Sequence, residues 1–399
     1  MKQAIENAVR VLTDKCGKGI SERDATLLRR AVETLYGNII PNTEEKPTCW
    51  GELRALAPAL SHYVGHWNWD SAFHSLAIQY WDPALAREQA KILFDVQNEN
   101  GCLTNVIFPN GANLDNRSQP PVWYWAYEEL DRLDPNDDDL AYAYAALTKH
   151  ESFWANLRKT DGLFRYDCDE GKKALYVKYE SGWDTSPRWD TYIPDVLWPI
   201  DLNCYMVLAY RSLAYMATRL QKSEDIERWQ KAERELTALI NERLWHEEMA
   251  SYCDTIIENG KPTGVETPAS FMPLFIGIAS KEQADAMMRF ATDENKFYPL
   301  MPSVSYDAPT YTAPDYFRGP MWLNMSYIAV NGLLRYGYTE LAEGYRNRIL
   351  DVCDKEERGL FEYYNSRTGE GRGACGYGWT SACVIRFILE SYEGCRIQA

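Results

Sequence analysis

The stretch ESGWDTSPRWD occupies residues 180–190 and is the most distinctive segment of the chain. A glycine and a proline within it exclude a long helix, so we expect a loop here. Asp184 lies near the aromatic residues Trp183 and Trp189, and an apolar wall raises the pKa of a carboxyl group because it disfavours the charged form. Such a carboxyl group suits a general acid. A capping aspartate, or one that pairs with Arg188, is an equally open interpretation.

Helical signals extend from this loop in both directions along the chain. Ser21 and Ser280 each begin a predicted cap, and Asp82 precedes a proline that suits a first helical turn. Apolar residues then recur at helical spacing. Further helices are predicted over 140–154, 202–220, 223–244, 321–334, 340–353 and 379–392. Strand signals are weak, and segments such as 163–166 predict small hairpins only.

These elements predict an all-α fold of about a dozen helices. Two architectures suit so many helices, a solenoid and a closed toroid of helical hairpins. The sequence has no repeat period of the solenoid kind, which favours the toroid. No linker divides the chain, so we expect residues 1–399 to form one catalytic domain. Long connections are predicted near 99–119, 160–200, 292–320 and 355–378, and loops of this length are usually functional. We expect them to gather on one face and form a cleft.

Composition narrows the class of function. The net charge is −16 and no basic run is present, which argues against a nucleic-acid partner. The chain has 14 Trp and 27 Tyr against 12 Phe. Trp and Tyr combine an apolar face with a hydrogen-bonding edge, which suits sugar rings as well as a large core.

Targeting and metal signals are absent from the sequence. The start of the chain has no apolar segment typical of a signal peptide, and the longest apolar stretch, 271–279, is too short to span a membrane. The ten cysteines form no CxxC pair, so we expect no zinc site. They are typical of reduced thiols in a cytoplasmic protein.

Further segments carry residues that suit a carbohydrate site. Glu362 lies between aromatic residues in FEYYNSRTGEG, 361–371, and is a candidate partner for Asp184, although a surface glutamate is the ordinary alternative. Asp70 in WNWDSAF, 67–73, resembles a helix N-cap and could also bind sugar hydroxyl groups beside two tryptophans.

Two more segments lead from loops into predicted helices. YFRGPMWLN, 316–324, offers Arg318 and Asn324 as hydrogen-bonding groups beside the aromatic plate of Trp322. An arginine that binds backbone carbonyl groups at the rim of a barrel is the alternative interpretation of Arg318. SQPPVWYWA, 118–126, also enters a helix and has prolines at its start.

Taken together, these segments resemble glycoside hydrolase family 63. ESGWDTSPR is similar to the ESGWD-x-SPR signature of that family and to a stretch of the family 37 trehalases. The WNWDSAF, SQPPVWYWA, YFRGPMWLN and FEYYNSRTGEG segments, and GYGWT at 376–380, resemble further segments of family 63 in the same order. The resemblance covers most of the chain, from Trp67 to Thr380. The chain has no room for the extra domain of large members, so it is similar to the short mannosylglycerate and glucosylglycerate hydrolases.

The resemblance implies an (α/α)6 barrel that hydrolyses α-linked sugars with inversion and without a metal or organic cofactor. It implies Asp184 as general acid, Glu362 as general base with Glu370 as the alternative, and Asp70 as a ligand of the glycone. The other candidates for substrate binding are Trp67, Trp69, Gln119, Trp183, Arg188, Arg318, Gly319, Trp322, Asn324, Glu370 and Trp379.

The substrate is expected to be a small carbohydrate, with a small α-glucoside favoured. The alternative is glucosylglycerate or mannosylglycerate, whose carboxylate would need a cation. Arg117, Arg188 and Arg372 lie in suitable loops, and none is diagnostic. A sugar epimerase on the same toroid and a non-catalytic sugar-binding protein are the competing classes. The sequence does not indicate an oligomeric state.

Overall fold

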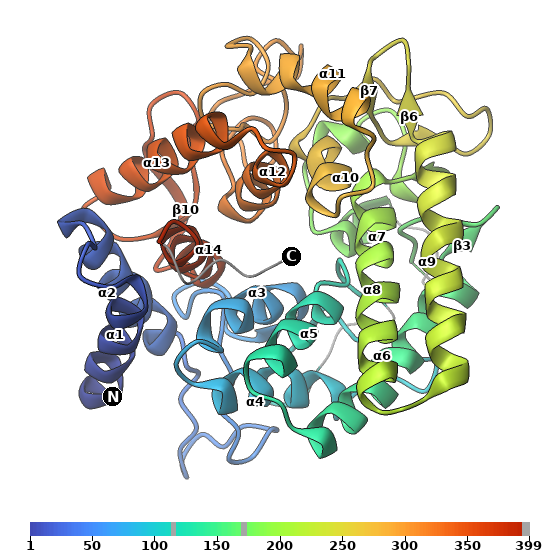
Figure 1. Ribbon diagram of the computed structural model, residues 1–399. Helices are drawn as coiled ribbons and strands as arrows, with labels where there is room; N and C mark the ends of the chain where they lie inside the picture. Colours follow the sequence, from blue (N-terminus) through green and yellow to red (C-terminus); the bar gives the residue numbers. More distant parts are fainter. Residues whose placement is uncertain (113–116, 169–173, 393–399) are drawn as a thin grey trace.

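The computed structural model describes residues 1–112, 117–168 and 174–392. Figure 1 shows the helices arranged as an inner and an outer ring around a central axis. The inner ring consists of α3 (Asn68–Ile78), α5 (Trp123–Leu133), α8 (Ile200–Arg219), α10 (Met272–Phe275), α12 (Leu323–Arg335) and α14 (Gly378–Leu389). Each contacts the next, and α14 contacts α3, which closes the ring. The architecture is consistent with an (α/α)6 barrel, as the sequence predicts.

The outer ring alternates with the inner one along the chain. It comprises α2 (Glu22–Gly37), α4 (Pro83–Phe94), α6 (Asp137–Leu157), α9 (Ser223–Arg243), α11 (Lys281–Thr292) and α13 (Thr339–Lys355), and α1 (Lys2–Cys16) packs on α2. The predicted caps form: the hydroxyl oxygen of Ser21 and a carboxylate oxygen of Asp82 accept backbone N–H groups, and Ser280 makes a capping box with Gln283.

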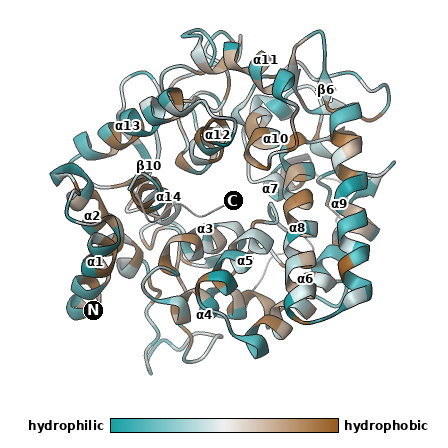
Figure 2. Cartoon of the chain, in the orientation of Figure 1, coloured by the Kyte–Doolittle hydropathy of each residue, from teal (hydrophilic) through white to brown (hydrophobic). Residues whose placement is uncertain are grey.

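The helices of the inner and outer rings differ in composition because they are buried to different extents. Every residue of α3 and of α14 is buried, because neighbours surround an inner helix. The outer helix α9 buries only Trp229, Leu236 and Ile240 among its residues, and the rest of its surface is mostly polar. Figure 2 shows this contrast as largely brown inner helices α10, α12 and α14 beside the mixed teal, white and brown of the outer α9. Buried apolar side chains from Ala8 to Leu389 form one contiguous core.

Strands are confined to two-stranded antiparallel ribbons in the described part of the chain. The pairs are β1 (His66–Trp67) with β2 (Val106–Ile107), β3 (Lys159–Thr160) with β4 (Leu163–Phe164), β5 (Leu197–Trp198) with β8 (Thr255–Ile256), β6 (Trp245–His246) with β7 (Ser251–Tyr252), and β9 (Phe361–Tyr364) with β10 (Gly371–Cys375). The β3–β4 hairpin confirms the one expected near 163–166. None of the described helices is both long and apolar enough to traverse a bilayer.

One expectation about the long loops needs correction. The connection 160–200 contains the helix α7 (Ala174–Ser181), so Glu180 and Ser181 end a helix instead of lying in a loop. Gly182 directly follows this helix and ends it, and Pro187 lies further along the chain, so neither residue prevents the helix. The next residues, 187–189, form a single 3-10 turn.

Candidate active site

A cavity of about 410 Å³ collects residues from the long connections. Its lining is Pro58, Tyr63, Trp67, Trp69, Asp70, Asn105, Arg117, Gln119, Tyr179, Gly182, Asp184, Tyr316, Phe317, Tyr377 and Trp379. These residues lie before and at the start of α3, at the start of α14, in the last turn of α7 and just after it, and in the loops before α5 and α12. The expectation that the long loops form a common cleft is therefore confirmed.

Asp184 reaches this cavity because the chain turns sharply after α7. Gly182 adopts φ +70°, a left-handed conformation that favours glycine. A Cβ atom at Gly182 would come within 2.6 Å of the Trp69 ring. Glycine is thus required twice, for the turn and for the close approach of the ring.

Glu180 stabilises the turn after α7 through buried contacts. Its buried carboxylate pairs with Arg158 at 3.0 Å and accepts the backbone N–H groups of Ser118 at 3.1 Å and Asp167 at 2.6 Å. Because Ser118 and Asp167 belong to separate loops, Glu180 holds both loops against the end of α7. The first residue of the ESGWD segment therefore has a positioning role that the sequence did not indicate.

The environment of Asp184 favours its protonated form. Burial, together with the negative charge of Glu362, raises the pKa of Asp184 from 3.8 to about 7, and Arg117 opposes the shift weakly. The carboxyl group therefore keeps a proton close to neutral pH.

Glu362 projects from β9 and is almost completely buried. Its Oε1 accepts hydrogen bonds from the hydroxyl groups of Tyr316 at 3.0 Å and Tyr63 at 3.2 Å, and its Oε2 accepts the backbone N–H of Ala374 at 3.0 Å. Burial raises the pKa of Glu362, and these three donors oppose the rise because they bind the charged form. Tyr63 and Tyr316 line the cavity, so the carboxylate of Glu362 is one hydrogen bond away from the cavity lining.

An irregularity in the β9–β10 ribbon creates the place for Glu362. The register shifts between Arg372 and Cys375, and Gly373 in the shift has φ +72°. A Cβ atom at Gly373 would lie 2.5 Å from Oε2 of Glu362. The bulge therefore leaves space for the carboxylate and turns the N–H of Ala374 towards it.

Asp70 is buried at the cavity wall and is not the N-cap of its helix. The N-cap of α3 is Trp67, and Asp70 lies in the first turn, where the helix dipole favours a negative charge. The hydroxyl of Tyr377 donates to its Oδ1 at 3.2 Å. Burial raises the pKa of Asp70 well above its ordinary value, and the charge of Glu362 adds to this rise. The capping interpretation was wrong.

Of the other predicted residues, Trp67, Trp69, Gln119 and Trp379 line the cavity. The side-chain oxygen of Gln119 accepts the backbone N–H of Trp69 at 3.1 Å, which joins two walls. Trp379 packs edge-on against Trp69 at a centroid distance of 5.1 Å. These rings form an aromatic surface beside Asp70.

Trp183 and Trp322 lie behind the cavity instead of lining it. Phe317, which does line it, stacks on Trp322 at 4.0 Å and lies 5.3 Å from Trp183. Both indole rings are almost fully buried. Their position supports Phe317 and leaves no face for a sugar, so their prediction as substrate-binding residues is corrected.

Both predicted arginines have protein partners. Arg188 is buried and pairs with Asp201 and Asp254, both at 2.7 Å, outside the cavity. Arg318 binds the carboxylate of Asp190 at 2.7 Å and the carbonyl oxygen of Thr185 at 3.1 Å. Neither lines the cavity, and the burial of Arg188 between two carboxylates contradicts its assignment to substrate binding. The assignment of Arg318 stays a prediction, and in this structure its side chain holds the loop of Asp184.

Gly319, Asn324 and Glu370 also lie outside the cavity lining. The backbone N–H of Gly319 donates to the hydroxyl of Ser303 at 2.9 Å, and Asn324 is fully buried in α12. Glu370 is exposed and pairs with Arg372 at 2.7 Å. The assignment of these three residues to substrate binding, and of Arg372 as a candidate cation, stays a prediction that the cavity lining does not support.

Sequence reasoning missed several of the lining residues. Tyr316 and Tyr377 lie inside two of the segments that suit a carbohydrate site, but only their neighbours carry the residue types that predicted binding. Tyr63 had no local signal, because its partner Glu362 is 299 residues away. Arg117 was one of three open candidates, and it is the one that lines the cavity. The described residues contain no group of three or more His, Cys, Asp or Glu side chains arranged to hold a metal ion.

Comparison with known proteins gives a consistent family. Residues 63–380 match the model of the mannosylglycerate hydrolase MGH1-like glycoside hydrolase domain. A mannosylglycerate hydrolase of Rubrobacter radiotolerans is 26% identical over 427 residues, which covers 85% of this chain and 94% of the relative. A glucosylglycerate hydrolase of Mycolicibacterium hassiacum is 23% identical, with 91% and 97% covered.

A solved structure shares the fold. The family 63 mannosylglycerate hydrolase of Thermus thermophilus, in complex with glucose, superposes with a TM-score of 0.78 at 24% identity, covering 90% of this chain and 99% of that one. The family model spans most of the sequence, including nearly all the segments that form the cavity. The chain therefore belongs to the MGH1-like glycoside hydrolases, within glycoside hydrolase family 63.

Proposed function

We propose that this glycoside hydrolase is an inverting α-glycosidase in which Asp184 is the general acid and Glu362 the general base. One observation carries the proposal: two electrostatically interacting carboxyl groups at the cavity differ in the hydrogen-bond donors around them. Burial raises the pKa of both, and the charge of Glu362 helps to raise that of Asp184 to about 7, whereas three hydrogen-bond donors to the charged form oppose the rise at Glu362. Two carboxyl groups in such unlike environments are the pattern of an acid–base pair.

In the proposed reaction, protonated Asp184 gives its proton to the glycosidic oxygen as the bond from that oxygen to the anomeric carbon breaks. A water molecule attacks the anomeric carbon from the opposite face, and Glu362 accepts the proton that the water loses. The products are a free hexose of β configuration and an alcohol. This route needs about 6.5–9.5 Å between the two carboxyl groups to accommodate the water.

The glycone subsite is proposed to lie against Asp70 and the aromatic surface of Trp67, Trp69 and Trp379. A buried carboxyl group accepts hydrogen bonds from sugar hydroxyl groups, and indole faces cover the apolar C–H face of a hexose. Because these groups converge at the start of α3 and of α14, they form a rigid wall.

For the aglycone we propose a small carboxylic acid of the glycerate type. Arg117 carries the positive charge among the described lining residues, and it packs 5.9 Å from the ring of Tyr179. A guanidinium group suits a carboxylate well. The names of the relatives, mannosylglycerate and glucosylglycerate hydrolase, point to the same substrates. A neutral α-glucoside is the second candidate, because the raised pKa values of Asp70 and Asp184 favour neutral carboxyl groups, which bind sugar hydroxyl groups without requiring a charged aglycone.

The experiment is a substrate panel. Wild-type enzyme and the Asp184→Asn variant are incubated with mannosylglycerate, glucosylglycerate, trehalose and maltose, and free hexose is measured. We expect release from a glycerate glycoside and a loss of about 10²–10⁴-fold in turnover for Asp184→Asn, the usual worth of general acid–base catalysis. A variant within about threefold of wild type would move the acid role to another residue.

A further inference from the structure

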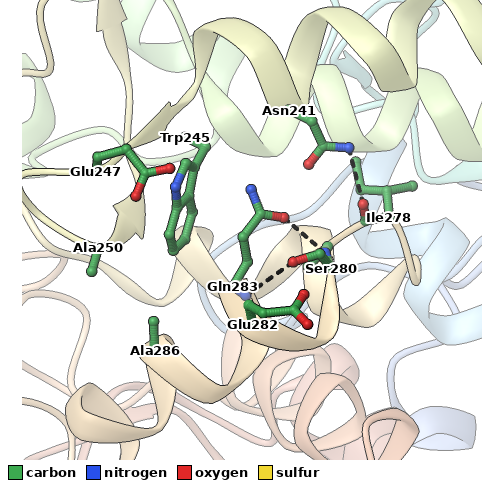
Figure 3. A pocket seen from close by; sticks show the side chains of 10 residues that line it. Asn241, Trp245, Glu247, Ala250, Ile278, Ser280, Glu282, Gln283 and Ala286 are labelled. Atoms are coloured by element: carbon green, nitrogen blue, oxygen red, sulfur yellow. Dashed lines mark hydrogen bonds between the residues drawn. The ribbon is translucent and has the colours of Figure 1, made fainter.

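A second hollow, of about 560 Å³, opens on the outer surface of the barrel. Its walls come from the end of α9, the β6–β7 hairpin, the loop before α11 and the first turns of α11 (Figure 3). It shares no lining residue with the cavity around Asp184. Nothing in the catalytic proposal uses it.

An indole ring forms one wall of this hollow. Trp245 is half-buried on β6, and Tyr252 of β7 packs against it with centroids 5.0 Å apart at 67°. Figure 3 shows the ring facing the side chain of Gln283 across the hollow. The hairpin fixes the orientation of the ring, so a planar apolar surface is available without rearrangement.

The opposite wall presents a fixed hydrogen-bond donor. Oε1 of Gln283 lies 2.7 Å from the backbone N–H of Ser280 and 2.8 Å from the hydroxyl of Tyr252. The single proton of the Tyr252 hydroxyl is also within reach of Oδ1 of Asn241, so the backbone N–H of Ser280 is the donor that determines the amide orientation. The Nε2 group then points into the hollow. The Nε2 group can donate a hydrogen bond to a ligand, but it cannot accept one.

Hydrogen-bond acceptors lie at the rim of the hollow. Glu247 and Glu282 are exposed and carry carboxylates, and none of the described lining residues is a cation. The lining also includes three alanines, Ala250, Ala279 and Ala286, together with Asn241 and Ile278. The small alanine side chains leave space beside the indole ring for a flat ligand.

We propose that this hollow is a non-catalytic binding site for a neutral saccharide that stacks on Trp245. Sugar hydroxyl groups both donate and accept, so they match the amide of Gln283 and the carboxylates of Glu247 and Glu282 together. An anionic sugar is disfavoured by the two carboxylates. A quaternary ammonium ion would suit the ring and the carboxylates but would leave the Gln283 donor facing a positive charge.

Fluorine NMR of protein labelled with 5-fluorotryptophan tests this site separately from the catalytic cavity. The resonance that disappears in Trp245→Phe is assigned to Trp245. We expect titration with maltotriose to shift this resonance with saturation below about 50 mM, which corresponds to a Kd in the millimolar range. In Ala286→Phe, which fills the space beside the ring, the apparent Kd should rise at least about tenfold.

Hydrolytic activity of Ala286→Phe should equal that of wild type, which shows that the variant is folded. If it does not fold, Glu247→Lys at the exposed rim replaces it, with the same expected weakening. A Trp245 resonance that does not move with maltotriose overturns the proposal. So does a resonance that moves with tetramethylammonium chloride and not with the sugar. Because the readout is local to Trp245, either result leaves the assignment of Asp184 and Glu362 unaffected.

Discussion

The hydroxyl of Tyr316 donates a hydrogen bond of 3.0 Å to Oε1 of Glu362, and the residue after Tyr316 is tied to the loop of Asp184. The backbone N–H of Phe317 donates to the hydroxyl of Thr185 at 3.3 Å, and Arg318 binds Asp190 on the same loop. One segment therefore contacts both the base candidate and the loop that carries the acid candidate. Their relative position is fixed by these bonds rather than by either loop alone.

We predict that Tyr316→Phe shifts the pH dependence of activity. Loss of a donor to the charged form raises the pKa of Glu362 further, so the acidic limb of kcat/KM should move to higher pH. A lost hydrogen bond to a charged group is worth about 1.5–3 kcal/mol, so kcat/KM should also fall about tenfold or more.

Tyr311→Phe is the matched control, because the Tyr311 hydroxyl contacts Ser366 at 3.0 Å and not Glu362. Its pH profile should coincide with that of wild type. If Tyr316→Phe also leaves the acidic limb in place, the hydroxyl does not tune the base.

Asp184→Asn is predicted to change stability in a pH-dependent way. The folded pKa of about 7 lies above the ordinary 3.8, so between these values the folded state holds a proton that the unfolded chain has released. Wild-type stability therefore falls as pH rises through this window. Asn does not ionise, so the Tm of the variant relative to wild type should increase from about pH 4 to about pH 7 and then level off. A difference that stays constant with pH would contradict the raised pKa.

Glu362→Gln should abolish hydrolysis, while Glu370→Gln should retain it. An amide cannot accept the proton of the attacking water, so the first variant lacks the base. The second variant changes an exposed carboxylate that pairs with Arg372 away from the cavity. Azide should restore turnover in Glu362→Gln by replacing the water. An inactive Glu370→Gln beside an active Glu362→Gln would reverse the assignment.

Arg117→Met should discriminate between substrates. If its guanidinium binds the aglycone carboxylate, KM for a glycerate glycoside should rise by about 10–100-fold, as expected when a buried charge pair is lost. The rate on a neutral α-glucoside should change little. An equal loss on both substrates would place Arg117 near the glycone or in a structural role.

Local chemistry explains which parts of this molecule could be predicted. The helix starts at Ser21, Asp82 and Ser280 depend on contacts within three or four residues, so sequence was sufficient. The same holds for the inner and outer helix faces, which follow from apolar spacing. The sequence did not predict the helix α7, because Gly182 and Pro187 were expected to exclude a long helix. Both residues follow α7, so they do not prevent it from forming.

Tertiary pairing explains the errors in the site. Arg188 looked available beside Asp184, but Asp254, which is 66 residues further along the chain, occupies its guanidinium. Trp183 and Trp322 belong to the right segments, yet Phe317 stands between them and the cavity wall. A motif identifies which segments meet, whereas the direction of each side chain depends on packing partners far away in sequence.

The stereochemistry of the product tests the central claim most directly. If Glu362 activates a water that attacks opposite the bond broken with help from Asp184, the anomeric configuration inverts. Proton NMR of a fresh hydrolysate, recorded before mutarotation, should show the β-anomer of the released hexose first. An α-anomer as the initial product would contradict the account, because it would mean that a carboxylate attacks the sugar directly.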